Sequence, residues 1–461
     1  MSRDKLLNIP AVRFGLIITG GAAAIFIIIF VLLPCLAVDF LPAGKPDPSL
    51  RARIQVEYWE KWTLFEAEAM KEIVSRFNNS QDRIWVNYRP VSRIDERFLV
   101  AAAGNNAPDV AGLQTYMIPD FASKGALMPL DEKAAEYGIR RNDYIPIFWD
   151  AGTFLGRLYA LPSTPVSIAL HYNKRLFREA GIDRPPRTIS ELDEYAAKLT
   201  TFDEKGRIKT LGFSPNVPGY YHWFWGYFFG GSLWKPEGRE ITIDSPANIN
   251  SFEWVQGYSE KYGGERLDSF KSGLGKLNTA TNPFITERVA MELEGVWMFN
   301  YIDRSENRDL EWGVAPFPSQ KGAPQNVTLA DCDQLVVPSG AKHPDEAFEF
   351  IAFVQKQENM ERLCLLQRKF TPLQKVSGEF WNKHPHPYIK TFYDLARSDN
   401  ARRVPSIPVF QEIRDEMNSA FSDVWSQMIP PEKALAEVQE RVTRIWEGEK
   451  QKILRRNEIK D

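Results

Sequence analysis

Apolar residues recur first with the period of a strand and then with that of a helix along the early part of the chain. Residues 54–58 alternate between apolar and polar side chains, whereas residues 65–77 carry an apolar side chain at every fourth position. The two patterns return as a strand over 84–88, a helix over 95–103 and a short apolar strand over 110–113. Strands that alternate with helices predict an α/β sheet with right-handed crossovers.

The middle and the end of the chain are mainly helical in pattern. Thr188 and Glu191 have the spacing of a capping box, which predicts a helix that runs to Leu199. Residues 345–355 place apolar side chains on one helical side, and the helical pattern returns from residue 409. No internal repeat interrupts this organisation.

An uncharged apolar segment precedes all of these elements. It covers residues 14–38, and as a helix it would be roughly 37 Å long, enough to cross a bilayer of about 30 Å. The cationic bias of the preceding residues predicts a cytoplasmic N-terminus over 1–13, a transmembrane anchor over 14–38 and an external linker over 39–51. Two alternatives are a lipid attached to Cys35, which Pro34 disfavours, and cleavage after Ala37, which the length of the apolar core disfavours.

Length and charge narrow the classes of function. A chain of 461 residues exceeds what one hydrophobic core usually supports, so we expect two lobes and an appendage. The formal net charge of −3 provides no field for nucleic acid, and we expect no nucleic-acid partner. Outside the apolar segment the only cysteines are Cys332 and Cys364, for which two free buried thiols are expected and a disulfide is the alternative.

Motifs for catalysis are absent from the sequence. We find no P-loop, no Gly-x-Gly-x-x-Gly, no Gly-x-Ser-x-Gly and no His-Glu-x-x-His. His384 and His386 are separated by a proline, a pattern more typical of a solvated loop than of a metal site. We therefore expect no catalytic residue, no metal and no cofactor, although paired carboxylates could still serve a glycosidase.

Several ordered blocks of sequence resemble the family 1 extracellular solute-binding proteins of ABC importers, the group that includes maltose-binding protein. The blocks span nearly the whole region after the apolar segment. They are residues 107–110, 121–130, 156–162, 171–177, 179–182, 185–188, 288–291, 295–297 and 312–318.

The resemblance implies a two-lobed, type II-like periplasmic-binding-protein fold that closes as a hinge on a ligand. It implies a first lobe of residues 52–162 with 328–375, and a second lobe of 163–327 with 376–461, crossed near 161–165 and 317–328. It also implies an external location, delivery of a carbohydrate to ABC permease subunits, and no enzymatic activity.

A sugar site combines aromatic rings for the apolar faces of a pyranose with polar groups for its hydroxyl rim. Aromatic and polar residues follow two predicted strands at the edge where α/β folds bind ligands. Others lie in the aromatic stretch over 219–234, in a Gly-Val-Trp motif that resembles a family stacking position, and in a short acidic run. The candidates are Trp59, Trp62, Gln114, Thr115, Tyr116, Trp223, Trp225, Glu294, Trp297, Asp331 and Asp333.

Other functions remain open at this point. The ligand could be a polyol, a sugar phosphate or a glycosaminoglycan fragment, although a phosphate favours arginines or lysines and the suspected site is acidic. A cationic amino sugar is consistent with acidic residues. The chain could instead be a tethered glycoside hydrolase or lyase, or a receptor ectodomain with only a short internal segment.

Overall fold

The computed structural model describes residues 52–104, 106–276 and 279–455. Residues 54–461 form one compact unit by their contacts, and the description below concerns that unit. Within the described residues, no helix has both the length and the hydrophobicity that a membrane crossing requires. The predicted anchor over 14–38, Cys35 and the linker over 39–51 lie outside the described residues.

The first lobe begins with the predicted alternation of strands and helices, which is confirmed. Strand β1 lies between β2 and β3 and is parallel to both, with Tyr58 opposite Tyr88 on one side and Val110 on the other. Helices α3, α13 and α14 pack together on this lobe. The elements are β1 (Ile54–Glu60), α3 (Leu64–Ser80), β2 (Ile84–Pro90), α4 (Ile94–Ala103), β3 (Val110–Gln114), α5 (Met117–Ser123), α6 (Asp131–Glu136), η3 (Arg141–Asp143), α7 (Pro146–Ala151), β4 (Thr153–Phe154), β5 (Arg157–Leu158), α13 (Pro344–Gln355) and α14 (Gln357–Leu366).

Helix α13 shows why the apolar spacing over 345–355 folds as it does. Ala347, Phe350, Ile351 and Val354 recur at helical spacing and are fully buried. The Phe350 ring lies 5.5 Å from that of Tyr58, which anchors the helix to β1. Truncating such a ring to alanine costs about 3–5 kcal/mol of folding free energy.

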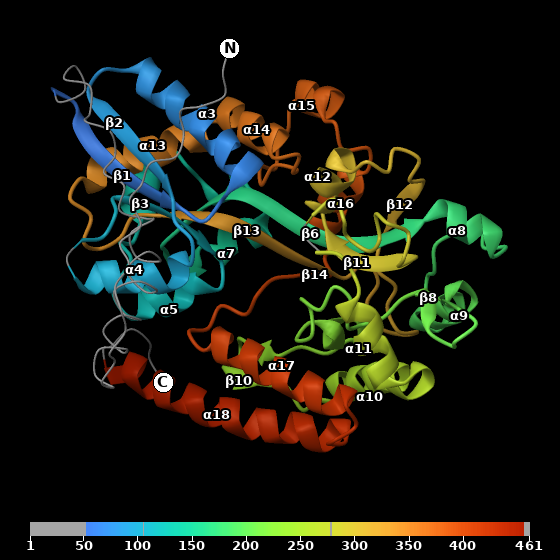
Figure 1. The fold of residues 1–461 in the computed structure, drawn as a ribbon. Coiled ribbons are helices and arrows are strands. Elements are labelled where there is room, and N and C mark those ends of the chain that lie inside the picture. The colour runs from blue at the N-terminus through green and yellow to red at the C-terminus, as the bar shows by residue number, and fades with distance from the viewer. Residues whose placement is uncertain (1–51, 105, 277–278, 456–461) are drawn as a thin grey trace, which may run out of the picture. The chain divides into compact units, whose positions relative to one another are not determined.

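One eight-stranded sheet runs through both lobes (Figure 1), in the order β11-β6-β13-β3-β1-β2, with β12 paired to β6 and β14 to β13. The first part of β6 pairs with β13, and its last part pairs with β11 and β12. Strand β6 therefore carries the chain from one lobe into the other. These strands are β6 (Leu161–Asn173), β11 (Met291–Gly295), β12 (Trp312–Ala315), β13 (Thr328–Val336) and β14 (Ala401–Arg402).

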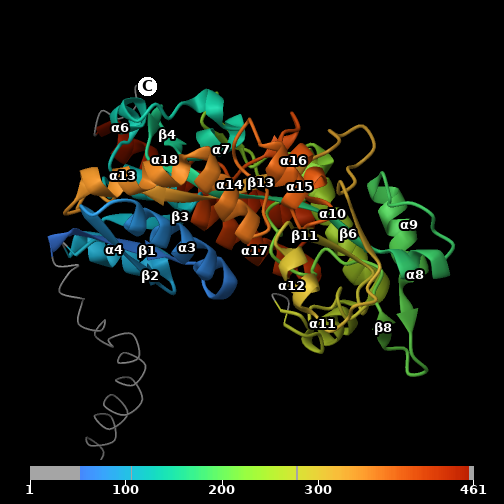
Figure 2. The same ribbon diagram turned by 90° about the horizontal axis from the view of Figure 1, so that it is seen from above.

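The second lobe is mainly helical, and α17 and α18 pack against α10 and each other (Figures 1 and 2). Its core is aromatic around Phe213, Trp225, Phe228 and Phe317. The elements are α8 (Lys174–Glu179), α9 (Ile189–Leu199), β7 (Thr201–Phe202), β8 (Ile208–Thr210), η4 (Trp225–Phe229), β9 (Trp234–Lys235), β10 (Glu240–Ile241), α10 (Pro246–Tyr262), α11 (Gly264–Ser272), α12 (Met298–Arg304), α15 (Gly378–Lys383), α16 (Ile389–Ala396), α17 (Phe410–Trp425) and α18 (Pro431–Arg455).

Two local details bear on the sequence predictions. Helix α9 has the predicted bounds, and the Thr188 hydroxyl accepts from the backbone N–H of Glu191 at 3.1 Å. The Glu191 carboxylate, however, accepts from Arg184 and from the Arg187 backbone, so only half of the capping box is used for capping. Cys332 and Cys364 are both buried free thiols, as expected.

Candidate ligand-binding cleft

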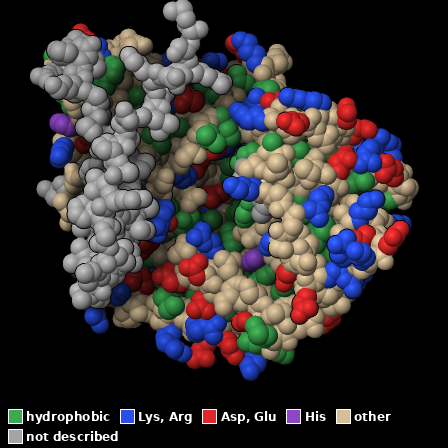
Figure 3. All heavy atoms as spheres, viewed as in Figure 1, with side chains coloured by type: hydrophobic (Ala, Val, Ile, Leu, Met, Phe, Trp, Pro, Cys, Tyr) green, Lys and Arg blue, Asp and Glu red, His purple; other side chains and the backbone are tan. Residues whose placement is uncertain are grey.

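A cleft of about 610 Å³ lies where the strands cross between the lobes. Its floor is formed by Val166 and Ile168 of β6 and by Leu329 and Asp331 of β13. These residues share one face because side chains at alternate positions of a strand point to the same side. In the view of Figure 3 the molecular face is hollowed near its centre, with acidic, basic and hydrophobic side chains at the border of the hollow.

The first-lobe wall contains a network of opposite charges that converge from distant parts of the sequence. The Lys61 ammonium lies 2.6 Å from the Asp333 carboxylate. Lys369, almost fully buried, lies 2.9 Å from Glu66 and 3.7 Å from Asp333. The two lysines hold the pKa of the Asp333 carboxyl below its usual value, although burial alone would raise it. Each ammonium group in this wall therefore already has an anionic partner.

Trp62 is fixed by this network. Its indole N–H donates to Asp333 Oδ2 at 3.0 Å, and the Lys61 and Lys369 ammonium groups lie 5.3 and 5.7 Å from its ring centre. Only 3% of the side chain is exposed. The indole lines the cleft, but it presents little of its flat surface there.

The buried carboxylate of Glu60 adjoins this network through Lys61. Glu60 accepts from the Tyr58 hydroxyl at 2.7 Å and from the Lys61 backbone N–H at 2.8 Å. A β-carbon at Gly112 would lie only 1.7 Å from this carboxylate, so β3 needs a glycine there. Burial raises the pKa of Glu60, and Lys61 opposes that effect.

The second-lobe wall is aromatic and carries Tyr220, Tyr221, Trp297 and Tyr301. The Trp297 ring lies directly against Gly295, because a β-carbon there would come within 2.1 Å of it. One region of the indole thus packs on bare backbone, while the half-buried side chain contributes to the cleft. Such a ring is a suitable surface for the apolar face of a pyranose.

Two buried glutamates lie on β11, behind this wall. Burial raises the pKa of Glu294 to about 8, and hydrogen bonds from the Gly295 backbone and the Trp297 side chain offset part of the effect. Burial and the neighbouring Glu294 also raise the pKa of Glu292. Both groups therefore favour the protonated form in the folded protein.

Asp331 is the acidic group of the cleft floor. Its Oδ1 accepts from the Cys332 backbone N–H at 2.8 Å, and in the described part of the chain no lysine or arginine forms an ion pair with it. Burial raises the pKa of Asp331 to about 6. The carboxylate can accept hydrogen bonds from hydroxyl groups in the cleft.

The structure brings five of the eleven predicted site residues to the cleft. They are Trp62, Gln114, Trp297, Asp331 and Asp333. Their contact with a ligand stays a prediction.

The other six lie elsewhere. Thr115 is buried, and its hydroxyl donates to the Cys332 carbonyl at 2.8 Å. Trp59 is partly buried and packs against the hydrophobic core. Glu294 lies behind Trp297. The remaining three are Tyr116, which contacts Phe410 and Arg414 of α17; Trp223, which packs on Phe410; and Trp225, which is in the aromatic core.

Sequence reasoning missed several residues that line the cleft. They are Lys61, Glu66, Tyr220, Tyr221, Tyr301 and Lys369. Lys61 directly precedes Trp62 at the end of the first strand, and that position was a usable signal. No sequence signal pointed to Lys369, because only the tertiary structure brings it close to Asp333.

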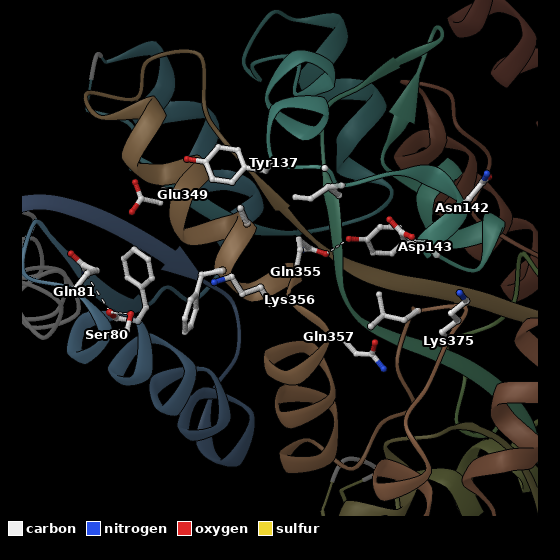
Figure 4. A pocket seen from close by; sticks show the side chains of 17 residues that line it. Ser80, Gln81, Tyr137, Asn142, Asp143, Glu349, Gln355, Lys356, Gln357 and Lys375 are labelled. Carbon is white, nitrogen blue, oxygen red and sulfur yellow. Dashed lines mark hydrogen bonds between the residues drawn. The ribbon is translucent and has the colours of Figure 1, made fainter.

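A larger hollow of about 830 Å³ lies on the first lobe, between α3, α13 and the loop before α7 (Figure 4). Its charged side chains are spread across the hollow, as Figure 4 shows, and they are Asp143, Glu349, Lys356 and Lys375. The Gln355 side-chain oxygen accepts a hydrogen bond from the Tyr144 hydroxyl at 2.8 Å. The polar groups of this hollow do not converge on one point, unlike those of the cleft.

Residues 66–361 match the family model described as bacterial extracellular solute-binding protein. The chain belongs to this family. The matched region contains both walls and the floor of the cleft, apart from Lys61, Trp62, Thr63 and Lys369. Members of the family bind solutes and are not classed as enzymes, which agrees at family level with the expected lack of catalysis.

Known solute-binding proteins resemble this one over most of its length. The structure of CpMnBP1 with mannobiose bound is 27% identical, has a TM-score of 0.76 and covers 85% of this chain and 100% of its own. The sn-glycerol-3-phosphate-binding periplasmic protein of Pectobacterium atrosepticum is 24% identical over 88% of this chain and 93% of its own. The maltotriose-binding protein of Pyrococcus abyssi is 22% identical over 57% of this chain and 53% of its own.

Proposed function

We propose that this protein is the extracytoplasmic substrate-binding component of an ABC-type carbohydrate importer, and that it captures a sugar or oligosaccharide by closing its lobes. The observation that carries the proposal is the position of Trp297, whose ring backs onto Gly295 and lines the cleft opposite hydrogen-bond acceptors. Three tyrosines extend this wall, and Asp331 and Gln114 supply polar groups for a hydroxyl rim. The mannobiose and maltotriose ligands of the relatives support the same class.

A phosphorylated solute is the second candidate, because one relative is named for sn-glycerol 3-phosphate. A phosphate favours an arginine or lysine cluster or the free N–H groups of a helix N-terminus. Lys61 and Lys369 are the lysines of the cleft lining, and both already contact carboxylates. A phosphate would also lie near Asp331 and Asp333. The charges in this cleft therefore favour a neutral or cationic sugar.

The membrane attachment, the location and the protein partners are also part of the proposal. We propose that residues 14–38 anchor the chain in the membrane, that residues 1–13 are cytoplasmic, and that the loaded ectodomain docks on ABC permease subunits. We also propose the type II-like variant of the fold and the lobe boundaries that the resemblance implies. Strand β6 pairs with β13 up to Ser167 and with β11 from Ile168, which supports a passage between the lobes along this strand, a few residues after the proposed boundary at 162.

A ligand screen on the full-length protein in detergent tests the proposed function. A solute that binds only the folded state raises the thermal midpoint by mass action. We expect a concentration-dependent rise with at least one mono-, di- or trisaccharide and none with sn-glycerol 3-phosphate at the same concentration. A rise with the phosphate alone would replace the proposal by the second candidate, and turnover of a labelled oligosaccharide would indicate an enzyme.

A further inference from the structure

A second pocket of about 590 Å³ shares no lining residue with the cleft and is rich in arginine. It is bounded by α7 of the first lobe, by η4 and β9 of the second lobe, and by the segment 396–406 that leads from α16 towards α17. Trp234 and Tyr227 provide an apolar side. The pocket therefore borders both lobes and the segment that links α16 to the helices of the second lobe.

The charges of this pocket are predominantly positive. Three arginines, Arg397, Arg402 and Arg403, line it together with only two acids, Asp150 and Asp399. Asp150 is already neutralised, because both of its oxygens accept from Arg141 at 3.0 Å. The pocket thus differs from the cleft, where each lysine has an anionic partner.

Arg403 has an unused donor in this pocket. Its Nη1 is buried, and within the described residues it has no hydrogen-bond partner. Burial lowers the pKa of Arg403, and Asp150, Tyr227 and Asp331 of the cleft floor oppose this effect. A buried guanidinium nitrogen without an acceptor is costly, so an acceptor that entered the pocket would relieve this cost.

Arg402 and Arg403 both influence the electrostatics of Tyr227, which lines the same pocket. Burial raises the pKa of the Tyr227 hydroxyl to about 12, and a hydrogen bond with the Leu233 backbone and the charges of both arginines oppose that rise. Arg402 uses its donors on the carbonyls of Asp399 and Ala401 and on Asn400. The Arg403 Nη1 is therefore the donor that the pocket offers to a compact anion, and Arg402 adds its positive charge.

We propose that this pocket is an anion site that binds a phosphoryl group of a small solute or of a lipid head group, separately from the ligand in the cleft. A phosphoryl group suits several arginines because it carries up to two charges and three acceptor oxygens. Since the pocket borders both lobes, its occupant is coupled to the opening and closing of the hinge.

Titration of the full-length protein in detergent with inorganic pyrophosphate tests the proposal by isothermal calorimetry, with sodium chloride at equal ionic strength as the reference. We expect saturable binding to one site that weakens with salt. Arg403→Gln should weaken it at least tenfold and Arg402→Gln at least threefold. Trp297→Ala should leave it unchanged, and so should Arg178→Gln, a control in which an arginine paired with Glu311 is removed.

Three results would overturn the proposal: no saturable heat beyond the sodium chloride reference, equal binding by both pocket variants and the parent, or loss of binding in Trp297→Ala. If Arg403→Gln does not fold, the half-buried Arg402 variant decides the question. Short-chain phosphatidylglycerol in place of pyrophosphate distinguishes the sources, because tighter binding of the lipid indicates a head group and tighter binding of pyrophosphate a free solute. None of these titrations requires a sugar, so they succeed or fail independently of the proposed function.

Discussion

On the first-lobe wall of the cleft, Lys61, Glu66, Asp333 and Lys369 each have an ionic partner, whereas the second-lobe wall presents the aromatic rings of Trp297 and its neighbours. The charged side chains satisfy each other in the absence of any ligand. The Trp297 ring instead packs on Gly295 with one region and contributes another to the lining of the cleft. The two walls therefore border the same cleft with different chemistry, ion pairs on one side and aromatic rings on the other.

This difference separates the residues that hold the cleft from those that recognise the ligand. A buried ion pair contributes little net stability, but removal of one partner leaves an uncompensated charge. An exposed aromatic face in a cleft can gain contact area without breaking an existing interaction. We therefore expect first-lobe variants to change stability and second-lobe variants to change affinity.

The largest effect is expected for Asp333→Ala, which should lower the free energy of unfolding by about 3 kcal/mol. The substitution leaves Lys61 without its closest carboxylate and Trp62 Nε1 without its acceptor. Urea unfolding followed by circular dichroism measures the change. Asp303→Ala removes a more exposed ion pair, with Arg368, and should cost less than about 1 kcal/mol. Equal costs for the two variants would contradict the structural role of the network.

The next effect is expected for Trp297→Ala, which should weaken saccharide binding about 30- to 100-fold while the protein stays folded. The variant loses the ring that backs onto Gly295. Calorimetric titration with a saccharide found in the screen measures the affinity. Trp59→Phe is the matched control, because Trp59 does not line the cleft. If Trp297→Ala kept the affinity of the parent, the proposed role of the second-lobe wall in saccharide recognition would be wrong.

A smaller effect concerns the pH dependence of stability through Glu294. Its pKa is about 8 in the folded protein and about 4.3 in an unfolded chain, so folding is favoured while the group is protonated. This contribution is complete below pH about 4, and it is lost as the pH rises towards 8. Glu294→Gln should therefore gain stability relative to the parent as the pH rises from 5 to 8. Parallel urea curves at the two pH values check this, and an equal difference at both would contradict it.

The smallest effect is expected for Asp331. Its pKa of about 6 implies that the carboxylate form, the better acceptor for sugar hydroxyls, predominates above pH 6. Saccharide affinity should fall severalfold between pH 7.5 and pH 5. In Asp331→Asn the affinity at pH 7.5 should be about three- to tenfold weaker and independent of pH in this range. A parent affinity that rises towards pH 5 would exclude this role for the ionised group.

Local patterns were sufficient for much of the fold. The alternation over 54–58 became β1, the four-residue recurrence over 65–77 became α3, and the spacing over 345–355 became α13. These elements bury one side against a neighbour, so the periodicity of the sequence carries the information. The aromatic stretch over 219–234 was harder to interpret, because only residues 225–229 form a short 3₁₀ helix, in which three of the four rings are buried.

The candidate site was predictable only where it follows from strand ends and from motifs. Trp62 and Gln114 come directly after or at the ends of parallel strands, whose carboxyl ends meet at one edge. The sequence does not reveal which aromatic residues of the stretch over 219–234 line the cleft, because this depends on the path of the backbone. Tyr220 and Tyr221 line the cleft, whereas Trp225 is buried in the core. Lys369 and Asp333 are brought together by tertiary structure alone, and no local pattern records that contact.

Saturation-transfer NMR on the full-length protein in detergent tests the central claim most directly. Aromatic protein protons are irradiated in the presence of a saccharide from the screen, and the transfer to each sugar proton is recorded. The structure predicts strong transfer to the axial C–H protons of one pyranose face, and its loss in Trp297→Ala but not in Trp59→Phe. Transfer that is spread evenly over the sugar, or that is unchanged in Trp297→Ala, would contradict recognition by the second-lobe wall.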